Sequence, residues 1–259
     1  MLIDTHTHLH DPEFDADLAA VIERARQTGI GRMITIGTDL ESSRKAVQLA
    51  ERYDLIYATV GVHPHEVKTL REESYDSLEH LVRSASGGKV VGYGEVGLDY
   101  YYMHSPKELQ QKHFRGQIRL ARKLRLPLII HTRQAPEETL AILKEVKADE
   151  VGGVFHCYTG DLATAQAAIA MNFFISFSGI LTFPKATDLQ TVAREIPMEH
   201  LLIETDCPYL APVPHRGKRN EPAYVCHVAE KLALIKGLPC EEIIDLTTKN
   251  ARRLFNKMA

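Results

Sequence analysis

The sequence of 259 residues contains no tryptophan and only four cysteines, none of them in a CxxC spacing. A disulfide framework or a thiolate zinc site is therefore not expected. No apolar run reaches the roughly 18 residues that a membrane span needs, and the start lacks the basic segment of a cleavable signal. No glycine-rich dinucleotide fingerprint follows the first apolar run. These absences predict a cytoplasmic protein that does not bind dinucleotides through a Rossmann-type fold.

Charge and hydrophobic content are those of an ordinary globular protein, with 25% charged and 44% hydrophobic residues and a net charge of −3. A chain with this balance is not a general electrostatic binder of nucleic acid. A polyanionic substrate would have to be held by local positive charge and by bound metal. No linker or low-complexity segment divides the chain, so we expect one hydrolase domain over residues 1–259.

Eight short apolar runs, many of them β-branched, predict strands at residues 2–8, 32–37, 56–62, 90–95, 127–131, 153–156, 173–178 and 200–206. Helical periodicity predicts helices at 15–29, 42–53, 74–85, 105–124, 136–147, 161–171, 187–195, 223–236 and 241–257. The sequence Ser105-Pro106-Lys107-Glu108 predicts a capping box at one helix start, with proline at the first helical position. Eight alternating units predict an α/β fold, a closed (β/α)₈ TIM-like barrel, rather than an open doubly wound sheet.

Metal-binding residue types recur at the ends of five predicted strands. In a barrel of this kind the C-terminal strand ends meet on one active face. Chance is a poor explanation for so many separate strand ends that each carry a histidine or a carboxylate. We therefore predict one metal site built from His6, His8, Glu95, His131, His156 and Asp206.

Four histidines and two carboxylates are too many ligands for a single four-coordinate ion. They suit two divalent cations about 3.5–4 Å apart, bridged by a carboxylate. Mixed ligands of this kind accept Zn, Mn, Co, Ni or Fe, and also Mg if water completes the shell. We assign one ion to His6, His8, Glu95 and Asp206, and the other to the bridging Glu95 with His131 and His156. Asp206 is expected to take the proton from the attacking water in a metal-assisted hydrolysis.

Other polar residues are expected around this site. His63 and His65 follow the third strand at the same barrel mouth, where His63 would take part in catalysis and both would contact substrate. Asp4 and Glu204 each lie two residues before a ligand, and alternation along a strand places them on the same face as that ligand. They would orient the ligating imidazoles, although a plain buried hydrogen-bonding role is an open alternative.

Positive charge near the predicted mouth indicates a phosphate-bearing substrate. Arg133 lies two residues past His131, where a guanidinium can bind a phosphate with two hydrogen bonds. The densest basic cluster follows the eighth strand and contains Arg216, Lys218 and Arg219. A solvated loop is the alternative explanation for this cluster. Three consecutive tyrosines at residues 100–102 would either stack on a base or pack their own loop.

Together these motifs resemble the TatD-type metal-dependent deoxyribonucleases of the amidohydrolase superfamily. The resemblance spans the whole chain in order, through Asp4-Thr5-His6-Thr7-His8, Gly61-Val62-His63-Pro64-His65, Gly94-Glu95-Val96-Gly97-Leu98-Asp99, His131-Thr132-Arg133, His156-Cys157-Tyr158-Thr159-Gly160, Glu204-Thr205-Asp206-Cys207-Pro208-Tyr209, Arg216-Gly217-Lys218-Arg219-Asn220-Glu221-Pro222 and Asn250-Ala251-Arg252-Arg253-Leu254-Phe255. It implies a TIM-like barrel with a divalent metal pair, the six ligands above, and DNA hydrolysis that includes exonucleolytic trimming. Glu95, with no lysine on the fifth strand, favours this branch over relatives that use a carboxylated lysine.

Three functions are compatible with these residues. The leading hypothesis is a deoxyribonuclease that acts on single-stranded DNA or DNA ends. The second keeps the same metals but hydrolyses an ester or amide, such as a lactone or an aminoacyl ester, because metal-activated water attacks carbonyl and phosphoryl centres alike. The third, a non-catalytic metal-binding protein, is disfavoured by the intact ligand set. No membrane association and no obligate protein partner are expected.

Overall fold

A computed structural model describes residues 1–258 and contains one sheet of eight parallel strands, in which each strand pairs with the next in chain order. The pairing of consecutive strands is what right-handed βαβ crossovers produce. The strands are β1 (Leu2–Thr7), β2 (Ile30–Ile36), β3 (Ile56–Val60), β4 (Val90–Asp99), β5 (Leu128–Arg133), β6 (Gly153–Phe155), β7 (Phe173–Phe177) and β8 (Leu201–Ile203).

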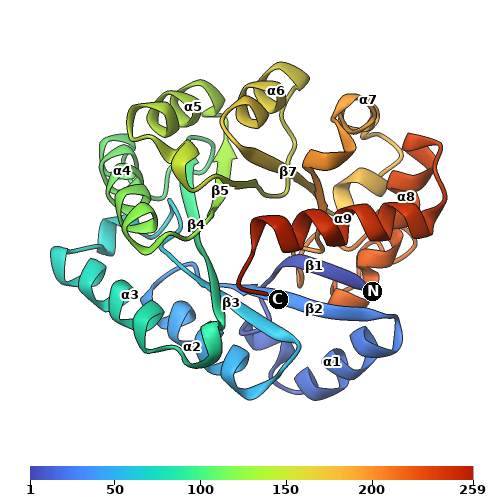
Figure 1. Ribbon diagram of the computed structural model, residues 1–259, viewed down its shortest axis with the longest axis horizontal. Coiled ribbons are helices and arrows are strands. Elements are labelled where there is room, and N and C mark those ends of the chain that lie inside the picture. Colours follow the sequence, from blue (N-terminus) through green and yellow to red (C-terminus); the bar gives the residue numbers. More distant parts are fainter. Residues whose placement is uncertain (259) are drawn as a thin grey trace.

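Helices surround the strands (Figure 1) and bury their apolar stripes against the outer face of the sheet. They are α1 (Leu18–Gln27), α2 (Leu40–Arg52), α3 (Glu72–Ser84), α4 (Lys107–Leu124), α5 (Pro136–Glu145), α6 (Leu162–Ala170), α7 (Thr187–Glu195), α8 (Val225–Lys236) and α9 (Cys240–Leu254). Short 3₁₀ turns join several of these elements. Among the helices of residues 1–258, none combines the length and apolar content that a membrane crossing requires.

The first and last strands close the sheet on itself. Thr7 and Cys207 form a parallel bridge. The N–H of His8 donates to the carbonyl of Cys207 at 2.8 Å, and the N–H of Asp206 donates to the carbonyl of His6 at 2.9 Å. These bonds join two of the chain segments that carry candidate ligands, those of His6 and His8 and of Asp206. The predicted (β/α)₈ barrel is thereby confirmed.

The inside of the barrel is apolar at one end. Its lining comes from all eight strands and includes Ile3, Ile34, Tyr57, Val91, Ile129, Val154, Phe174 and Leu202. The segment after α9 packs on the same cluster through Phe255 and Met258, and Figure 1 shows α9 crossing the barrel with the C-terminus near its centre. This end is sealed, so chemistry is confined to the opposite mouth.

At the other end of the barrel, the rows of inward-facing side chains on the strands continue with polar residues. His131 follows Ile129 at a spacing of two on β5, and Glu204 follows Leu202 in the same way beyond β8. Because side chains two apart on a strand face one side, the interior changes from apolar to polar along the barrel axis. Polar ligands therefore gather where the strands end.

One predicted local feature is wrong. The hydroxyl of Ser105 donates to the carbonyl of His65 at 2.7 Å and accepts from the N–H of Lys68 at 3.3 Å. Helix α4 begins at Lys107 after Pro106, and no side chain caps its first turn. The predicted capping box does not form, because the serine connects the loop after β3 to the loop after β4.

Two glycines allow the strands to approach closely where the ligands lie. Gly97 has φ +149°, and a Cβ at this position would collide with the carbonyl oxygen of His131 on the neighbouring strand. Gly94, directly before Glu95, has φ +150°, and a Cβ there would lie 2.6 Å from the carbonyl oxygen of Ile129. Only glycine meets both conditions, so β4 and β5 can hold Glu95 and His131 side by side.

Candidate metal centre

Glu95 lies at the middle of the mouth, with 4% of its surface exposed. Its Oε1 atom is 2.9 Å from Nε2 of His156, 3.0 Å from Nδ1 of His131 and 3.3 Å from Nε2 of His63. Its Oε2 atom faces another way, 3.4 Å from Nε2 of His6. One carboxylate whose two oxygens face different sets of imidazoles has the arrangement of a bridging ligand.

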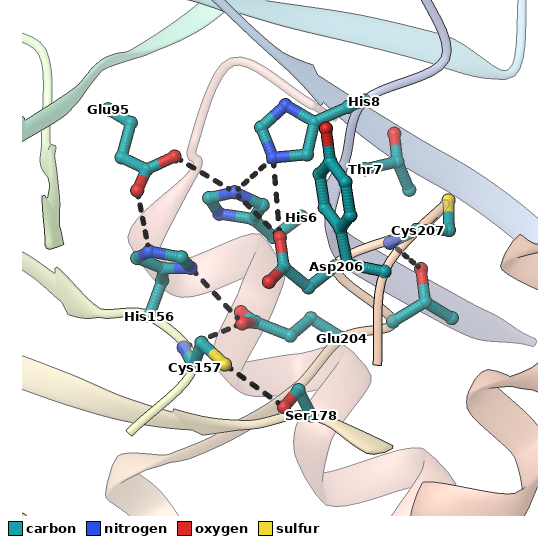
Figure 2. Close-up of polar contacts among 12 residues, drawn as sticks. His6, Thr7, His8, Glu95, His156, Cys157, Ser178, Glu204, Asp206 and Cys207 are labelled. Carbon is teal, nitrogen blue, oxygen red and sulfur yellow. Dashed lines mark hydrogen bonds and ion pairs between the residues drawn. The ribbon is translucent and has the colours of Figure 1, made fainter. Parts of the chain in front are cut away.

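Asp206 closes the other side of this group (Figure 2). Its Oδ1 atom lies 3.3 Å from Nε2 of His8 and 3.6 Å from Nε2 of His6. The Nε2 atoms of His6 and His8 are themselves 3.3 Å apart. The ring of His6 stacks on that of His156, with 3.9 Å between their centroids. Strands β1 and β4 and the segments after β1, β6 and β8 thus bring their ligand atoms to one point.

The donor atoms of this cluster fit a metal site. The ionised carboxylate of Asp99 can only accept a hydrogen bond, so Nε2 of His131 must carry the proton that faces it. Nδ1 of the neutral ring then presents a lone pair to Oε1 of Glu95. Two acceptors 3.0 Å apart need a proton or a cation between them. The Nε2 atoms of His6 and His8 also face each other, and each can present a lone pair to a shared cation when its ring is protonated only at Nδ1. The ligand atoms lie close enough to share an ion in three groups: His6 with His8 and Glu95, His6 with His156 and Asp206, and His63 with Glu95 and His131.

Protonation states in the cluster follow from burial and mutual charge. Burial alone would raise the pKa of Glu95, but the imidazoles of His156, His63 and His131 outweigh it and hold that pKa well below the ordinary value. Burial lowers the pKa of His63 to about 4, against the opposing pull of Glu95. An ionised carboxylate and a neutral imidazole are the forms that bind metal.

Three other imidazoles hold protons more tightly. Burial lowers the pKa of His8, yet its hydrogen bond to Asp206 outweighs burial and leaves the pKa raised. The pKa values of His131 and His156 are raised in the same way by neighbouring carboxylates, against burial. Each of these rings must lose its extra proton before it can ligate a cation, so metal binding at this centre is expected to release protons.

Asp99 is a candidate site residue that the sequence pattern alone did not predict. Its Oδ2 atom accepts from Nε2 of His131 at 3.2 Å and from Nε2 of His65 at 3.0 Å. Burial raises the pKa of this carboxyl, and the hydrogen bonds from His131, Tyr102 and His65 outweigh it and leave the pKa lowered. Its spacing from Glu95 by four residues on one strand was the signal that could have identified it.

The side chain of Asp4 does not lie on the same face of β1 as those of His6 and His8, contrary to the prediction. Its carboxylate accepts from the hydroxyl of Thr205 at 2.6 Å and from the N–H of Thr205 at 3.0 Å. It also accepts from the backbone N–H of His6, but from no imidazole in the described part of the chain. A register shift in β1 between Asp4 and Thr7 breaks the strict alternation of side chains. Asp4 thus fastens β1 to the end of β8.

Glu204 lies where an orienting residue is needed. Its Oε1 atom is 3.4 Å from Nδ1 of His156 and accepts from the N–H of Cys157 at 2.6 Å (Figure 2).

Cys157 and Asp206 both have left-handed backbone, with φ of 42° and 59°. Strained non-glycine residues of this kind gather at functional sites, because the surrounding structure must hold them in place.

The residues expected to contact substrate lie at different distances from the cluster. His65 borders the cluster, with its ring 4.3 Å from that of His63, and is hydrogen-bonded to Asp99. Arg133 is exposed at the rim, with its guanidinium 4.1 Å from the ring centre of Tyr101. No carboxylate within residues 1–258 forms an ion pair with Arg133.

The basic loop after β8 is largely occupied by contacts within the protein. Arg219 pairs with Asp17 at 2.8 Å, and Arg216 lies 3.7 Å from the ring centre of Phe183. Lys218 is exposed, and its ammonium has no hydrogen-bond partner in the described chain. Substrate binding by all three was predicted and is untested, but the contacts of Arg219 and Arg216 within the protein disfavour it for those two, and Lys218 is the cation of this loop that is most free to bind substrate.

Comparison with known proteins places the chain in a family. A family model described as TatD related DNase matches residues 3–256. The chain belongs to the TatD-related DNase family. It is 47% identical to the uncharacterized metal-dependent hydrolase YabD of Bacillus subtilis, over 98% of this chain and 99% of that protein. It is 35% identical to the 3′-5′ ssDNA/RNA exonuclease TatD of Edwardsiella piscicida, again over 98% and 99%.

Solved structures agree with this membership. The crystal structure of YJJV, a TatD homolog from Escherichia coli, matches with a TM-score of 0.92 and 32% identity, over 98% of each chain. A TatD family hydrolase from Entamoeba histolytica matches with a TM-score of 0.89 and 26% identity, over 98% of this chain and 97% of the other. This member of the family is a metal-dependent hydrolase with a TIM-barrel fold.

Proposed function

We propose that this protein hydrolyses phosphodiester bonds at the ends of single-stranded nucleic acid, with two divalent cations in one catalytic domain that spans the chain. The position of Glu95 carries the proposal, because its two carboxylate oxygens face separate sets of imidazoles at 2.9–3.4 Å. The proposed metal ligands are His6, His8, Glu95, His131, His156 and Asp206. Zn, Mn, Mg, Co, Ni and Fe are all compatible with these ligand types.

His63 joins this proposal as a further ligand. It was expected to act on substrate, but its Nε2 atom lies 3.3 Å from Glu95 Oε1, in one group with His131. His156 lies in a group with His6 and Asp206 as well as beside Glu95. The favoured arrangement therefore has Glu95 in common, with His63 and His131 on one side, His6, His8 and Asp206 on the other, and His156 within reach of both.

The cations, when bound, lower the pKa of water and neutralise charge on the phosphoryl oxygens. Asp206 is the carboxylate proposed to accept the proton of the attacking water. Burial raises its pKa, but the hydrogen bond from His8 and the charges of nearby imidazoles outweigh it and leave the pKa lowered, so the carboxylate is ready to accept. Arg133 and His65 at the rim would hold the phosphate, and Asp99 and Glu204 keep His131 and His156 in place.

Two observations favour a phosphodiester over a carboxylic ester or amide. Arg133 presents at the mouth a guanidinium that forms no ion pair among residues 1–258, and a relative with 35% identity over nearly the whole chain is named as a 3′-5′ ssDNA/RNA exonuclease. The ligands themselves serve either reaction, so hydrolysis of a lactone or an aminoacyl ester at the same centre is the second candidate.

Digestion of single-stranded DNA labelled at one end or the other tests the proposal. Metal-stripped protein is resupplied with Mg²⁺, Mn²⁺ or Zn²⁺ and compared with Glu95→Ala and with Glu145→Ala, a surface carboxylate that pairs with Arg115. Shortening that needs metal, is lost in Glu95→Ala and persists in Glu145→Ala is the expected result. Absence of shortening with every metal, while a model ester is still hydrolysed, would move the assignment to the second candidate.

A further inference from the structure

Two large aromatic side chains stand exposed beside the metal centre. Tyr101 and Tyr102 directly follow β4 and have 52% and 51% of their surfaces exposed. Their rings meet edge to face, 4.8 Å apart. The guanidinium of Arg133 lies 4.1 Å from the ring centre of Tyr101 and 4.7 Å from that of Tyr102. We call these three side chains the stacking platform.

The stacking platform is fixed to the metal centre through Asp99. The Oδ1 atom of Asp99 accepts from the N–H of Tyr101 at 2.9 Å and from the N–H of Tyr102 at 2.8 Å. The Oδ2 atom of the same carboxylate accepts from His131, a candidate ligand. The ring of Tyr102 also lies 5.6 Å from that of His65. Anything bound on these rings is therefore held next to the candidate metal ligands.

The chemistry of the platform matches a nucleotide. Aromatic faces bind bases of any sequence, because every base has a π-face. A guanidinium that lies against a ring keeps its N–H edge available for phosphate. Arg133 also lacks an acidic partner within the described chain, which leaves its charge for a ligand.

Aromatic surface borders the centre on a second side. Tyr209, after β8, is 50% exposed, and its ring lies 5.8 Å from that of His8. Its hydroxyl donates to Asp11 at 3.1 Å, which fixes the ring. A phosphodiester between two nucleosides has a base on each side, so aromatic surface on two sides suits such a substrate.

We propose that the stacking platform of Tyr101, Tyr102 and Arg133 binds one unpaired nucleobase next to the scissile phosphate. This inference rests on the proposed function and narrows its substrate to nucleic acid whose terminal bases are unstacked. In a duplex both faces of a base are covered by its neighbours, so the platform selects single strands or frayed ends.

Equilibrium binding tests the platform apart from turnover. Metal-free protein is titrated with fluorescein-labelled oligothymidylate, and with the same chain whose terminal nucleotides carry an abasic tetrahydrofuran. The double variant Tyr101→Ala/Tyr102→Ala is expected to raise the Kd for the natural chain about tenfold, the usual size of a lost base–aromatic stack. The Kd for the abasic chain, already weak, is expected to stay the same.

Matched variants separate stacking from folding. Tyr101→Phe/Tyr102→Phe keeps both rings and is expected to bind as the wild type does. Leu234→Ala removes an apolar side chain of α8 that is 79% exposed, and is expected to change neither Kd. Two results would overturn the proposal that the platform binds a base. One is an equal Kd of the wild type for the natural and abasic chains, and the other is an equal loss of affinity for both chains in the double alanine variant.

The cleavage assay distinguishes the two proposals. Cleavage of the natural chain by the wild type, with no loss in the double alanine variant, overturns the platform and leaves the nuclease function standing. Binding that depends on the base and on both tyrosines, without cleavage under any metal, supports the platform and overturns the nuclease function.

Discussion

At the scale of single residues, Asp99 connects several parts of the mouth through one carboxylate. It accepts hydrogen bonds from two imidazoles and two backbone N–H groups. A hydrogen bond to Nε2 of His131 fixes the tautomer that leaves Nδ1 free toward Glu95. Asp99 therefore couples the position of a metal ligand to the position of the exposed tyrosines.

Asp99→Asn is expected to weaken metal binding about 10- to 100-fold, because outer partners of ligating histidines have effects of this size. The amide keeps the volume of the side chain but removes the negative charge that favours the needed tautomer. Titration of the metal-free protein with Mn²⁺ or Zn²⁺ measures the change. Asp188→Asn, at an exposed position of α7, is the matched control, and an unchanged affinity in Asp99→Asn would contradict this role.

Asp4 predicts a pH dependence of stability in the metal-free protein. Burial raises its pKa from 3.8 to about 8, despite hydrogen bonds from Thr205 and His6. Between those values the native state holds a proton that the unfolded state has lost, so the free energy of unfolding should fall as pH rises through this window. In urea unfolding from pH 4 to 8, the free energy of unfolding of Asp4→Asn should depend less on pH than that of the wild type. Parallel curves for the two proteins would refute the raised pKa of Asp4.

At the scale of elements, the segment that follows α9 seals the end of the barrel opposite the metal centre. Phe255 is fully buried among inward-facing residues of the strands. Phe255→Ala should lower the free energy of unfolding by about 3–5 kcal/mol, the usual cost of this truncation in a core. Urea denaturation measures it, with the exposed Arg252→Ala as control. If Phe255→Ala lowers the free energy of unfolding no more than Arg252→Ala does, the segment after α9 contributes little to stability.

Sequence periodicity predicted every strand and helix of the barrel to within a few residues, because burial of one face fixes the spacing of apolar residues. It also brought the candidate ligands to one mouth, since strand ends share an edge. It failed where side chains pair across long separations. The contacts of Ser105 with the loop after β3, and of Arg219 with Asp17, have no local pattern.

The position of Asp4 shows a different limit. Strict alternation would place Asp4 with His6 and His8, but a register shift in β1 turns its carboxylate toward Thr205. A bulge of one residue reverses the face of every side chain beyond it, and no residue type in this strand signals it.

At the scale of the whole molecule, the net charge of −3 and the internal pairing of Arg219 leave few cations for substrate. Each phosphate contact with a single strand contributes about −0.7 to the slope of log K against log salt concentration. Binding of oligothymidylate should therefore have a shallow slope, reduced in magnitude by Arg133→Ala and unchanged by Arg219→Ala. Anisotropy titrations at several salt concentrations test this, and an equal change in both variants would be the contrary result.

The central claim is that Glu95 joins two cations into one hydrolytic centre, and a metal titration of the stripped protein tests it most directly. Calorimetry with Mn²⁺ gives the number of ions per chain and the protons released, and shortening of end-labelled single-stranded DNA is measured in the same samples. We predict two ions per wild-type chain, proton release from the raised histidines, and shortening that appears as the ions bind. Glu95→Ala should lose both the paired binding and the shortening, and two ions with full activity in that variant would contradict the account.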